Sequence, residues 1–387
     1  MKILIFDMCF SVSGHRIPYA ALAAEAFADC EVVVAFPKQI QGESVLGNYF
    51  SDQVSFQFFD AQPKVKALEI VRESWRCLVR QIRHTRPDTV VVPTGDGMAF
   101  WGGIKNLIGL AGTGGVPIDV SLMKGHFRSP SDSWLKKTVS NIKWWVVTKG
   151  PWRKILLIDP RSFEDLKNPA SRNVILCPDP APPQKFFDRV EARQALELPI
   201  RGQLLVSVGN QEERKGSDLL LKAFEQLKGD TSATLLMIGK FSDEVKNMAE
   251  QVSSLCKGEN KIVIRDEYVS DDQLQQAVVA SDVVAVPYRD VERPSGIVSR
   301  AVAWGRPLLA TDGGWLKWFV IKYKAGHLTN PQDPQQFGQD IKRALEASLK
   351  FKPSAESTEF SIFNSAAMYR DIWRLAPNNP TVEHKEK

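Results

Sequence analysis

The sequence has few cysteines, and their arrangement marks neither a metal site nor a disulfide framework. Five cysteines (Cys9, Cys30, Cys77, Cys177 and Cys256) are scattered over 387 residues, and no two of them form a CxxC pair. Zinc sites and secreted disulfide scaffolds place cysteines at short, regular spacings. The spacing here argues against both and favours a reducing compartment.

Long apolar runs and a large charge of one sign are also missing. No segment approaches the roughly 18 consecutive apolar residues of a membrane span, and Met1 leads into the strand-like ILIF without a signal peptide. The formal net charge is only +5, from 50 basic and 45 acidic residues, so composition does not indicate nucleic acid as a partner. We expect a cytoplasmic protein that is at most peripheral to a membrane.

Two cofactor signatures are absent as well. No Gly-x-Gly-x-x-Gly follows the first strand, which argues against an NAD-type dinucleotide enzyme. No Asp-x-Asp stands in a loop after a strand, which favours chemistry without a metal. The sequence therefore predicts no metal and no bound cofactor.

What the chain does contain is a repeated alternation of apolar runs and helical patterns. Strands are predicted at 2–7, 30–36, 54–59, 89–93, 116–123, 155–158 and 174–176, and again at 204–208, 234–238, 261–264, 282–287 and 308–311. Helices are predicted at 19–28, 64–84, 217–228, 244–255, 271–280, 295–302, 334–345 and 360–375. Between the two halves, residues 177–183 read CPDPAPP, which no helix interior or central strand tolerates. The pattern predicts two doubly wound, Rossmann-like α/β domains joined by a proline linker.

Residues 283–314 carry the most informative stretch. A strand ends at Pro287, a polar loop holds Glu292, and Ser295 is placed to cap a short helix that ends at Gly305. Such a helix points its free amides at the carboxyl edge of the sheet, where an anion can dock. After the next strand, residues 312–314 (Asp-Gly-Gly) predict an open turn.

This stretch resembles the donor-binding signature of the family 4 glycosyltransferases, enzymes of the GT-B fold that transfer sugars from nucleotide donors with retention of configuration. Glu292 falls on the first glutamate of the signature, and Gly313 and Gly314 fall on its glycine pair. The second glutamate, which grips the nucleotide ribose in the family, is Arg300, and a guanidinium accepts no hydrogen bond from a ribose hydroxyl. The departure implies either an altered nucleotide contact or a lost activity.

A second resemblance lies in the loop from Gly209 to Gly216. Lys215 falls on the family's phosphate-binding lysine, and Asn210 stands where an arginine is usual, so that Arg214 supplies charge from a different position. A solvated Glu-Glu-Arg-Lys turn is the alternative interpretation. The Glu292 stretch in the same half favours the functional one.

The resemblance implies a role for each candidate site residue. Glu292 contacts the donor sugar, and the amides of the residues that begin the helix lie near the sugar and phosphates. The predicted donor site comprises Gly209, Asn210, Arg214, Lys215, Tyr268, Ser295, Gly296, Ile297, Val298 and Arg300, with Gly313 and Gly314 near the sugar. From the first domain, His126 is a catalytic candidate, and Gly14 and His15 shape the cleft. For both histidines an ordinary structural role stays equally open.

The family also implies an architecture and a reaction. Domains are expected at 1–183 (acceptor) and 184–358 (donor), facing across a cleft, with a helix at 359–376 crossing back and a flexible tail at 377–387. The implied activity is a retaining, metal-independent transfer from a nucleotide-diphosphate sugar to a glycan, a lipid-linked or a small-molecule acceptor, in the manner of cell-envelope or polysaccharide biosynthesis. Because Arg300 and Asn210 both touch the nucleotide, the alternative is an inactive GT-B protein that binds sugar or nucleotide or serves as a partner subunit.

Residues 124–154 interleave lysine and arginine with four tryptophans against a single acid, Asp132. That mixture suits contact with an anionic membrane surface. It equally suits a segment whose aromatic face packs on the core and whose basic face is exposed to solvent. Residues 144–147 also have the pattern of a strand. We favour the core-facing interpretation and keep the membrane contact as a hypothesis.

Overall fold

The structure is a computed structural model that describes residues 1–12, 15–63, 66–123, 133–166, 173–182, 184–186, 188–227, 232–256 and 260–375. The chain forms two compact units. Unit 1 comprises Met1–Pro180 together with the C-terminal segment from Ala366, and unit 2 comprises Ala181–Ser365. The sequence analysis expected the domain boundaries between residues 183 and 184 and between 358 and 359, whereas the units divide between 180 and 181 and between 365 and 366.

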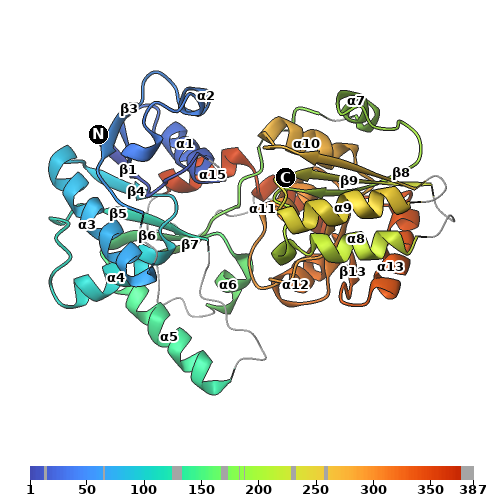
Figure 1. The fold of residues 1–387 in the computed structure, drawn as a ribbon. Coiled ribbons are helices and arrows are strands. Elements are labelled where there is room, and N and C mark those ends of the chain that lie inside the picture. The colour runs from blue at the N-terminus through green and yellow to red at the C-terminus, as the bar shows by residue number, and fades with distance from the viewer. Residues whose placement is uncertain are drawn as a thin grey trace. The chain divides into compact units, whose positions relative to one another are not determined.

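Unit 1 contains a seven-stranded parallel sheet in the order β3-β2-β1-β4-β5-β6-β7 (Figure 1). Residues 3–6, 32–36 and 90–92, in the strands β1, β2 and β4, form continuous apolar runs because both faces of a parallel sheet are covered by helices. The elements of unit 1 are β1 (Lys2–Phe6), α1 (Arg16–Ala26), β2 (Glu31–Pro37), η1 (Lys38–Ile40), α2 (Val45–Tyr49), β3 (Ser55–Phe59), α3 (Ala67–Thr85), β4 (Thr89–Val92), α4 (Asp96–Leu107), β5 (Ile118–Leu122), α5 (Trp134–Thr148), β6 (Trp152–Leu157), α6 (Pro160–Asp165), β7 (Val174–Leu176) and α15 (Ala366–Arg374).

Unit 2 repeats this design with a six-stranded parallel sheet in the order β10-β9-β8-β11-β12-β13. The elements are α7 (Arg189–Ala195), β8 (Gln203–Val208), η2 (Glu213–Lys215), α8 (Ser217–Glu225), β9 (Ala233–Gly239), α9 (Asp243–Leu255), β10 (Lys261–Asp266), α10 (Asp271–Ala280), β11 (Val283–Val286), α11 (Gly296–Ala303), β12 (Leu308–Thr311), α12 (Gly314–Tyr323), β13 (Gly326–Thr329), α13 (Pro334–Ser348) and α14 (Ala355–Phe363). The predicted class, two doubly wound α/β sheets, is confirmed.

In both sheets the strand order reverses at one point. In unit 1 the chain builds outward from β1 to β3 and then returns to place β4 on the other side of β1. In unit 2 the reversal lies between β8 and β11. The loops that leave the two strands at such a point diverge to opposite faces and open a crevice, so ligands bind there. The loops after β8 and β11 are those that hold the sequence-predicted Lys215 and Glu292.

Two secondary-structure predictions are wrong. Residues 144–147, which also read as a strand, belong to α5. Ser133 caps the start of this helix, because its hydroxyl accepts from the Lys136 amide at 3.4 Å. The single helix expected at 360–375 is two helices, α14 and α15. The helix is interrupted because the Asn364 carbonyl accepts from the Ala181 amide at 2.9 Å, and Ser365 bridges to Ala181.

Other elements lie where no helix or strand was predicted. Helix α4 starts at Asp96, shortly after the strand predicted at 89–93, and α12 starts at Gly314, at the end of the predicted turn. The edge strand β13 was also missed. Each was missed because glycines at its start or its interior weaken the periodic signal.

Candidate functional site

The loop between β8 and α8 is held by a buried side chain that the sequence analysis did not single out. The Gln211 amide oxygen accepts from the hydroxyls of Ser207 and Ser217, at 3.1 and 2.9 Å. Its amide nitrogen donates to the carbonyls of Ser207 and Gly209, at 3.1 and 2.9 Å. Gln211 thus forms hydrogen bonds with residues at both ends of the loop, and these bonds fix the backbone conformation of the residues between them.

Lys215 lies at the end of this loop, next to the loop that follows β11. Its Nζ is 3.5 Å from the Tyr288 hydroxyl and 5.0 Å from the centroid of the ring. A Cβ atom placed on Gly209 would lie 3.4 Å from the same Nζ, so the ammonium stands over a residue without a side chain. Within the residues that the structure describes, Lys215 has no salt bridge. A half-buried ammonium without a carboxylate partner can receive an anionic ligand.

The two loops are fastened together by an ion pair and by a close backbone contact. Arg289 donates to both oxygens of Asp218, at 2.6 and 2.7 Å, and its amide donates to the Arg214 carbonyl at 3.1 Å. Burial acts to raise the pKa of Asp218, but the Arg289 guanidinium outweighs it and holds that pKa below its ordinary value. A Cβ on Gly216 (φ 68°) would lie 1.9 Å from the Pro287 carbonyl oxygen, so only glycine fits there.

Glu292 and Gly314, predicted separately from the sequence, are brought together. A Cβ atom on Gly314 (φ 49°) would lie 2.7 Å from Glu292 Oε1, so the carboxylate rests against the start of α12. The Trp315 amide donates to the Val291 carbonyl at 2.7 Å, which fixes the backbone beside Glu292. The carboxylate is thus positioned by backbone contacts although its side chain is exposed.

The start of α11 leaves amides without a capping side chain. Ser295 was expected to cap this helix, but its side chain makes no capping hydrogen bond. The serines that cap helices in unit 2, Ser242, Ser270 and Ser354, have ψ of 152°, 163° and 169°, whereas Ser295 has ψ of 119°. The expectation was therefore wrong for the side chain, and the first-turn amides of α11, from Gly296 to Val298, remain available to an anion.

The other side chains predicted for the donor site differ from Lys215 in their ion pairs or in their exposure. Arg300 donates to Asp271 at 3.2 Å, and its side chain is 14% exposed. Arg214 pairs with Glu212 at 2.5 Å, and Asn210 is exposed. Tyr268, which follows β10, is 60% exposed. Arg300, which occupies the sequence position of the family's ribose-binding glutamate, therefore forms an ion pair with the first residue of α10.

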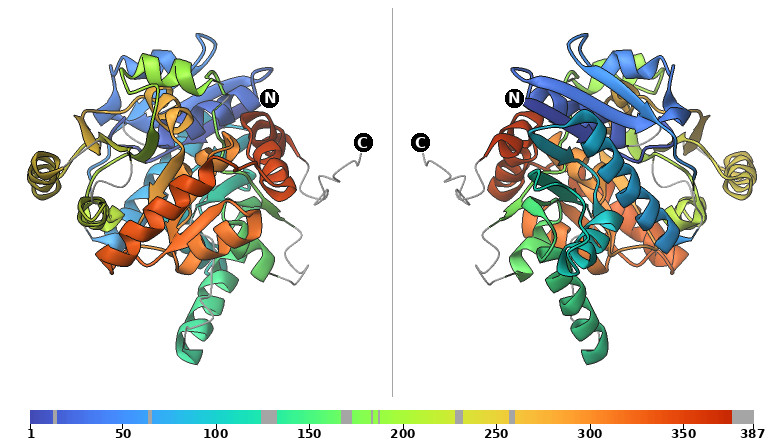
Figure 2. Two further views of the ribbon diagram at one scale, coloured as in Figure 1. Left: turned by 90° about the vertical axis from the view of Figure 1, so that its right-hand side faces the viewer. Right: turned by 90° about the vertical axis from the view of Figure 1, so that its left-hand side faces the viewer.

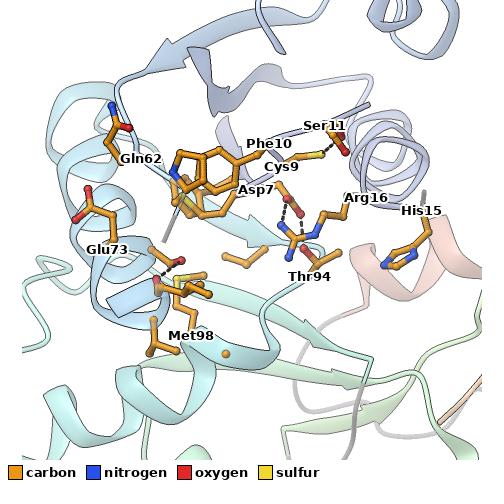
Figure 3. Close-up of a pocket in the computed structure, with 18 residues that line it drawn as sticks. Asp7, Cys9, Phe10, Ser11, His15, Arg16, Gln62, Glu73, Thr94 and Met98 are labelled. Carbon is orange, nitrogen blue, oxygen red and sulfur yellow. Dashed lines mark hydrogen bonds and ion pairs between the residues drawn. The ribbon is translucent and has the colours of Figure 1, made fainter. Parts of the chain in front are cut away.

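Unit 1 has a pocket of about 470 Å³ at the carboxyl ends of β1 and β4 (Figure 3). Asp7, fully buried at the end of β1, pairs with Arg16 at 2.9 Å and accepts from the Thr94 hydroxyl. Burial raises the pKa of Asp7, although Arg16 and Thr94 counter it. His15 lines the same pocket, with its ring centroid 5.1 Å from that of Tyr19. His126 and Gly14 lie outside the described residues.

Sequence reasoning missed Asp7 and Thr94, although a signal for Asp7 was present. An acid directly after a continuous apolar strand lies at the edge of the sheet where ligands bind. In the described part of the chain, no three histidine, cysteine, aspartate or glutamate side chains gather as a metal site requires. No helix among the described residues has both the length and the apolarity to cross a bilayer.

Comparison with known proteins relates the second half of the chain to one family. Residues 202–347 match the family model described as "Glycosyl transferases group 1". The D-inositol 3-phosphate glycosyltransferase of Xylanimonas cellulosilytica is 26% identical over 203 residues, which are 51% of this chain and 48% of that protein. The lipopolysaccharide 1,2-N-acetylglucosaminetransferase of Salmonella typhimurium is 27% identical over 44% of this chain and 46% of its own length. The chain thus spans about half the length of the curated relatives that it matches.

Solved structures resemble the chain over nearly its whole length. Anabaena HepE, in complex with UDP and glucose, has a TM-score of 0.65 at 17% identity and covers 96% of this chain and 98% of its own. The sucrose-phosphate synthase of Thermosynechococcus elongatus has a TM-score of 0.69 at 17% identity, with the same coverage. Both units therefore share the fold of these proteins, which is GT-B.

Proposed function

Residues 202–347 belong to the group 1 glycosyltransferases, and from this premise we propose that the protein transfers a sugar from a nucleotide-diphosphate donor bound by unit 2. The observation that carries the proposal is the site of Lys215, whose ammonium pairs with no carboxylate of the described residues and lies 3.5 Å from the Tyr288 hydroxyl at the reversal point of the sheet. The HepE structures, with UDP, UDP-glucose, or UDP and glucose, support a donor of this class.

The chemistry that this site would perform is stabilisation of a leaving diphosphate. Negative charge grows on the diphosphate as the bond to the sugar breaks, and fixed positive groups lower the energy of that transition state. Lys215 supplies a full charge, and the uncapped amides of α11 supply dipoles that need no reorganisation. We propose that these groups do the work without a metal.

We further propose transfer with retention of configuration. Glu292, held against Gly314, is placed to contact hydroxyls of the donor sugar. A departing phosphate oxygen then takes the proton of the acceptor hydroxyl, so no second catalytic carboxylate is needed. In unit 1, the pocket beside Asp7 and His15 is our candidate for the acceptor, whose class, whether glycan, lipid-linked or small molecule, stays open.

The test is release of nucleoside diphosphate from a panel of nucleotide sugars by the purified protein. We expect release with at least one donor, and thermal stabilisation by one of UDP, GDP and ADP above the others, because the three differ in the base that the donor site must accommodate. Glu292→Ala should retain nucleotide binding and lose turnover. If no donor is cleaved although a nucleotide binds, the protein is the inactive GT-B subunit instead.

We also propose that α5 contacts an anionic membrane. Val146 and Val147 are buried, whereas Trp134, Leu135, Ile142 and Trp145 are 77%, 67%, 57% and 52% exposed. Residues 133–149 include four lysines and no acid, and α5 projects from unit 1 in both views of Figure 2. An exposed apolar stripe bordered by lysines alone complements an anionic bilayer surface. This would place the protein at the cytoplasmic face of a membrane.

Replacing both Trp134 and Leu135 by glutamate is expected to reduce binding to phosphatidylglycerol-containing vesicles at least about tenfold, because burial of such side chains contributes about 1.5–3 kcal/mol each. Flotation of the full chain with vesicles measures the bound fraction. Ile321→Glu with Ile362→Glu, two exposed positions of unit 2, is the matched control and should leave binding unchanged. Absence of wild-type binding to these vesicles would refute the membrane contact.

A further inference from the structure

Unit 1 has a second pocket, of about 700 Å³, that shares no lining residue with the pocket beside Asp7. One wall is α3 and the other is α4. Its lining consists of Arg72, Arg76, Arg80, Arg83, Trp75, Val79, Trp101, Lys105, Leu110, Ala111 and Gly112. We call this surface the arginine groove.

The charge of the arginine groove is unbalanced. Five of its lining side chains are cations, and none is an acid. Arg76 pairs with Glu73 at 3.2 Å, whereas Arg72, Arg80, Arg83 and Lys105 form no salt bridge with the residues that the structure describes. Like charges spaced four apart on a helix repel one another and destabilise it. A merely solvated helix face would intersperse acids, so this alignment is better explained by a ligand.

The floor and one wall of the groove are rigid. The Trp75 indole is buried, donates to the Ala111 carbonyl at 3.2 Å and stands edge-on to Trp152 with centroids 5.9 Å apart. Gly102 of α4 makes room for it, because a Cβ there would lie 2.6 Å from the Trp75 ring. Trp101 holds Arg72 and Lys105 against its ring, at 5.2 and 5.5 Å from the centroid. Cations held in this way lose less entropy when a ligand binds.

We propose that the arginine groove binds an oligoanion that carries several phosphate groups. Guanidinium groups match phosphate oxygens with paired hydrogen bonds. Arg72 and Arg83 are 11 positions apart on α3, which is about 16 Å along the helix axis, too far for a single phosphate to reach both. The ligand is either a soluble phosphorylated compound or a set of anionic lipid headgroups, which present the same chemistry.

The experiment measures binding of two probes to the full chain by calorimetry: inorganic tripolyphosphate, and a short-chain phosphatidylglycerol kept below its micelle concentration. At least one probe is expected to bind, and which one binds identifies the source. Because hydrogen bonds to charged groups contribute about 1.5–3 kcal/mol each, Arg72→Glu with Arg80→Glu should weaken binding by about 100-fold or more. Raising the salt from low to high concentration should also weaken it, through screening.

Two controls separate the arginine groove from other effects. Lys350→Glu with Lys352→Glu makes the same charge change at exposed positions of unit 2 and should leave binding unchanged. Lys215→Ala should leave unchanged the part of the binding that Arg72→Glu with Arg80→Glu removes, which distinguishes this site from the proposed donor site, so either proposal can fail alone. Thermal unfolding of each variant without ligand checks the fold. The proposal is overturned if neither probe binds, or if the Arg72/Arg80 variant binds as the wild type does.

Discussion

Replacing Lys215 by alanine is expected to lower the rate of donor cleavage by about 100- to 1,000-fold, the effect of removing one preorganised group from a site of developing charge. The ammonium is held over Gly209 and beside Tyr288, and no carboxylate of the described residues pairs with it. Its charge is therefore unused in the free protein and available to the leaving diphosphate. Nucleoside diphosphate release, measured with the donor identified from the panel, gives the ratio of rates.

Arg214→Ala is the matched control for this substitution. Arg214 precedes Lys215 in the same loop, and replacing it by alanine removes the same charge. Its guanidinium, however, pairs with Glu212 and is about half exposed. We expect its loss to change the rate by less than about tenfold, since an exposed pair contributes little. Equal effects of the two substitutions would mean that the loop attracts the donor by overall charge, and the specific role of Lys215 would be wrong. Near-normal activity of Lys215→Ala would have the same consequence.

The fold class and the positions of most strands could be predicted because they depend on local sequence signals. Buried parallel strands require continuous apolar runs, so 308–311 was predicted to the residue, and the loops that follow such strands hold the ligand groups. Glu292 and Gly314 were predicted through the resemblance to the family signature, and the structure brings them into contact: the carboxylate occupies the space where a Cβ of residue 314 would be.

The rest could not be predicted because it depends on partners distant in sequence. The pairing of Arg300 with Asp271 joins two helices, and no local pattern marks it. Gln211 matters because four groups around it need hydrogen-bond partners, which only the folded loop reveals. In α5 the aromatic and β-branched residues at 144–147 favour a strand locally, and the packing of Val146 and Val147 overrides that preference.

Asp119→Ala is expected to destabilise unit 1 by about 3–5 kcal/mol, because it leaves a buried charge without its partner. Asp119 and Lys154 are 3.2 Å apart, and both side chains are fully buried. Lys154 also donates to the Ile372, Trp373 and Leu375 carbonyls, at 3.4, 2.6 and 3.1 Å, and so anchors the end of α15. Without Asp119 the ammonium keeps only these carbonyl acceptors. Urea unfolding, followed by a probe in unit 1, measures the loss.

Lys154→Met is the informative comparison, because the two halves of the pair are not equivalent. Asp119 keeps a second partner, Arg153, which donates to both of its oxygens at 2.8 and 2.6 Å. The loss in Lys154→Met should therefore be smaller, about 1–3 kcal/mol, from the unsatisfied carbonyls at the end of α15. If Lys154→Met proves as damaging as Asp119→Ala, the anchoring of α15 outweighs the buried charge.

The pH dependence of Asp119→Ala supplies an independent test of the buried charge. Burial lowers the pKa of Lys154 below its ordinary 10.5, and the charge of Asp119 opposes that shift, so removing Asp119 lowers the pKa further. Between this lowered pKa and 10.5 the unfolded chain binds more protons than the folded one, and stability rises with pH. The deficit of Asp119→Ala relative to the wild type should therefore shrink as the pH rises towards 10.5, because Lys154 loses its proton at a lower pH in the variant than in the wild type. A deficit that does not change with pH would mean that lost packing at Asp119, rather than an unpaired ammonium, destabilises the variant.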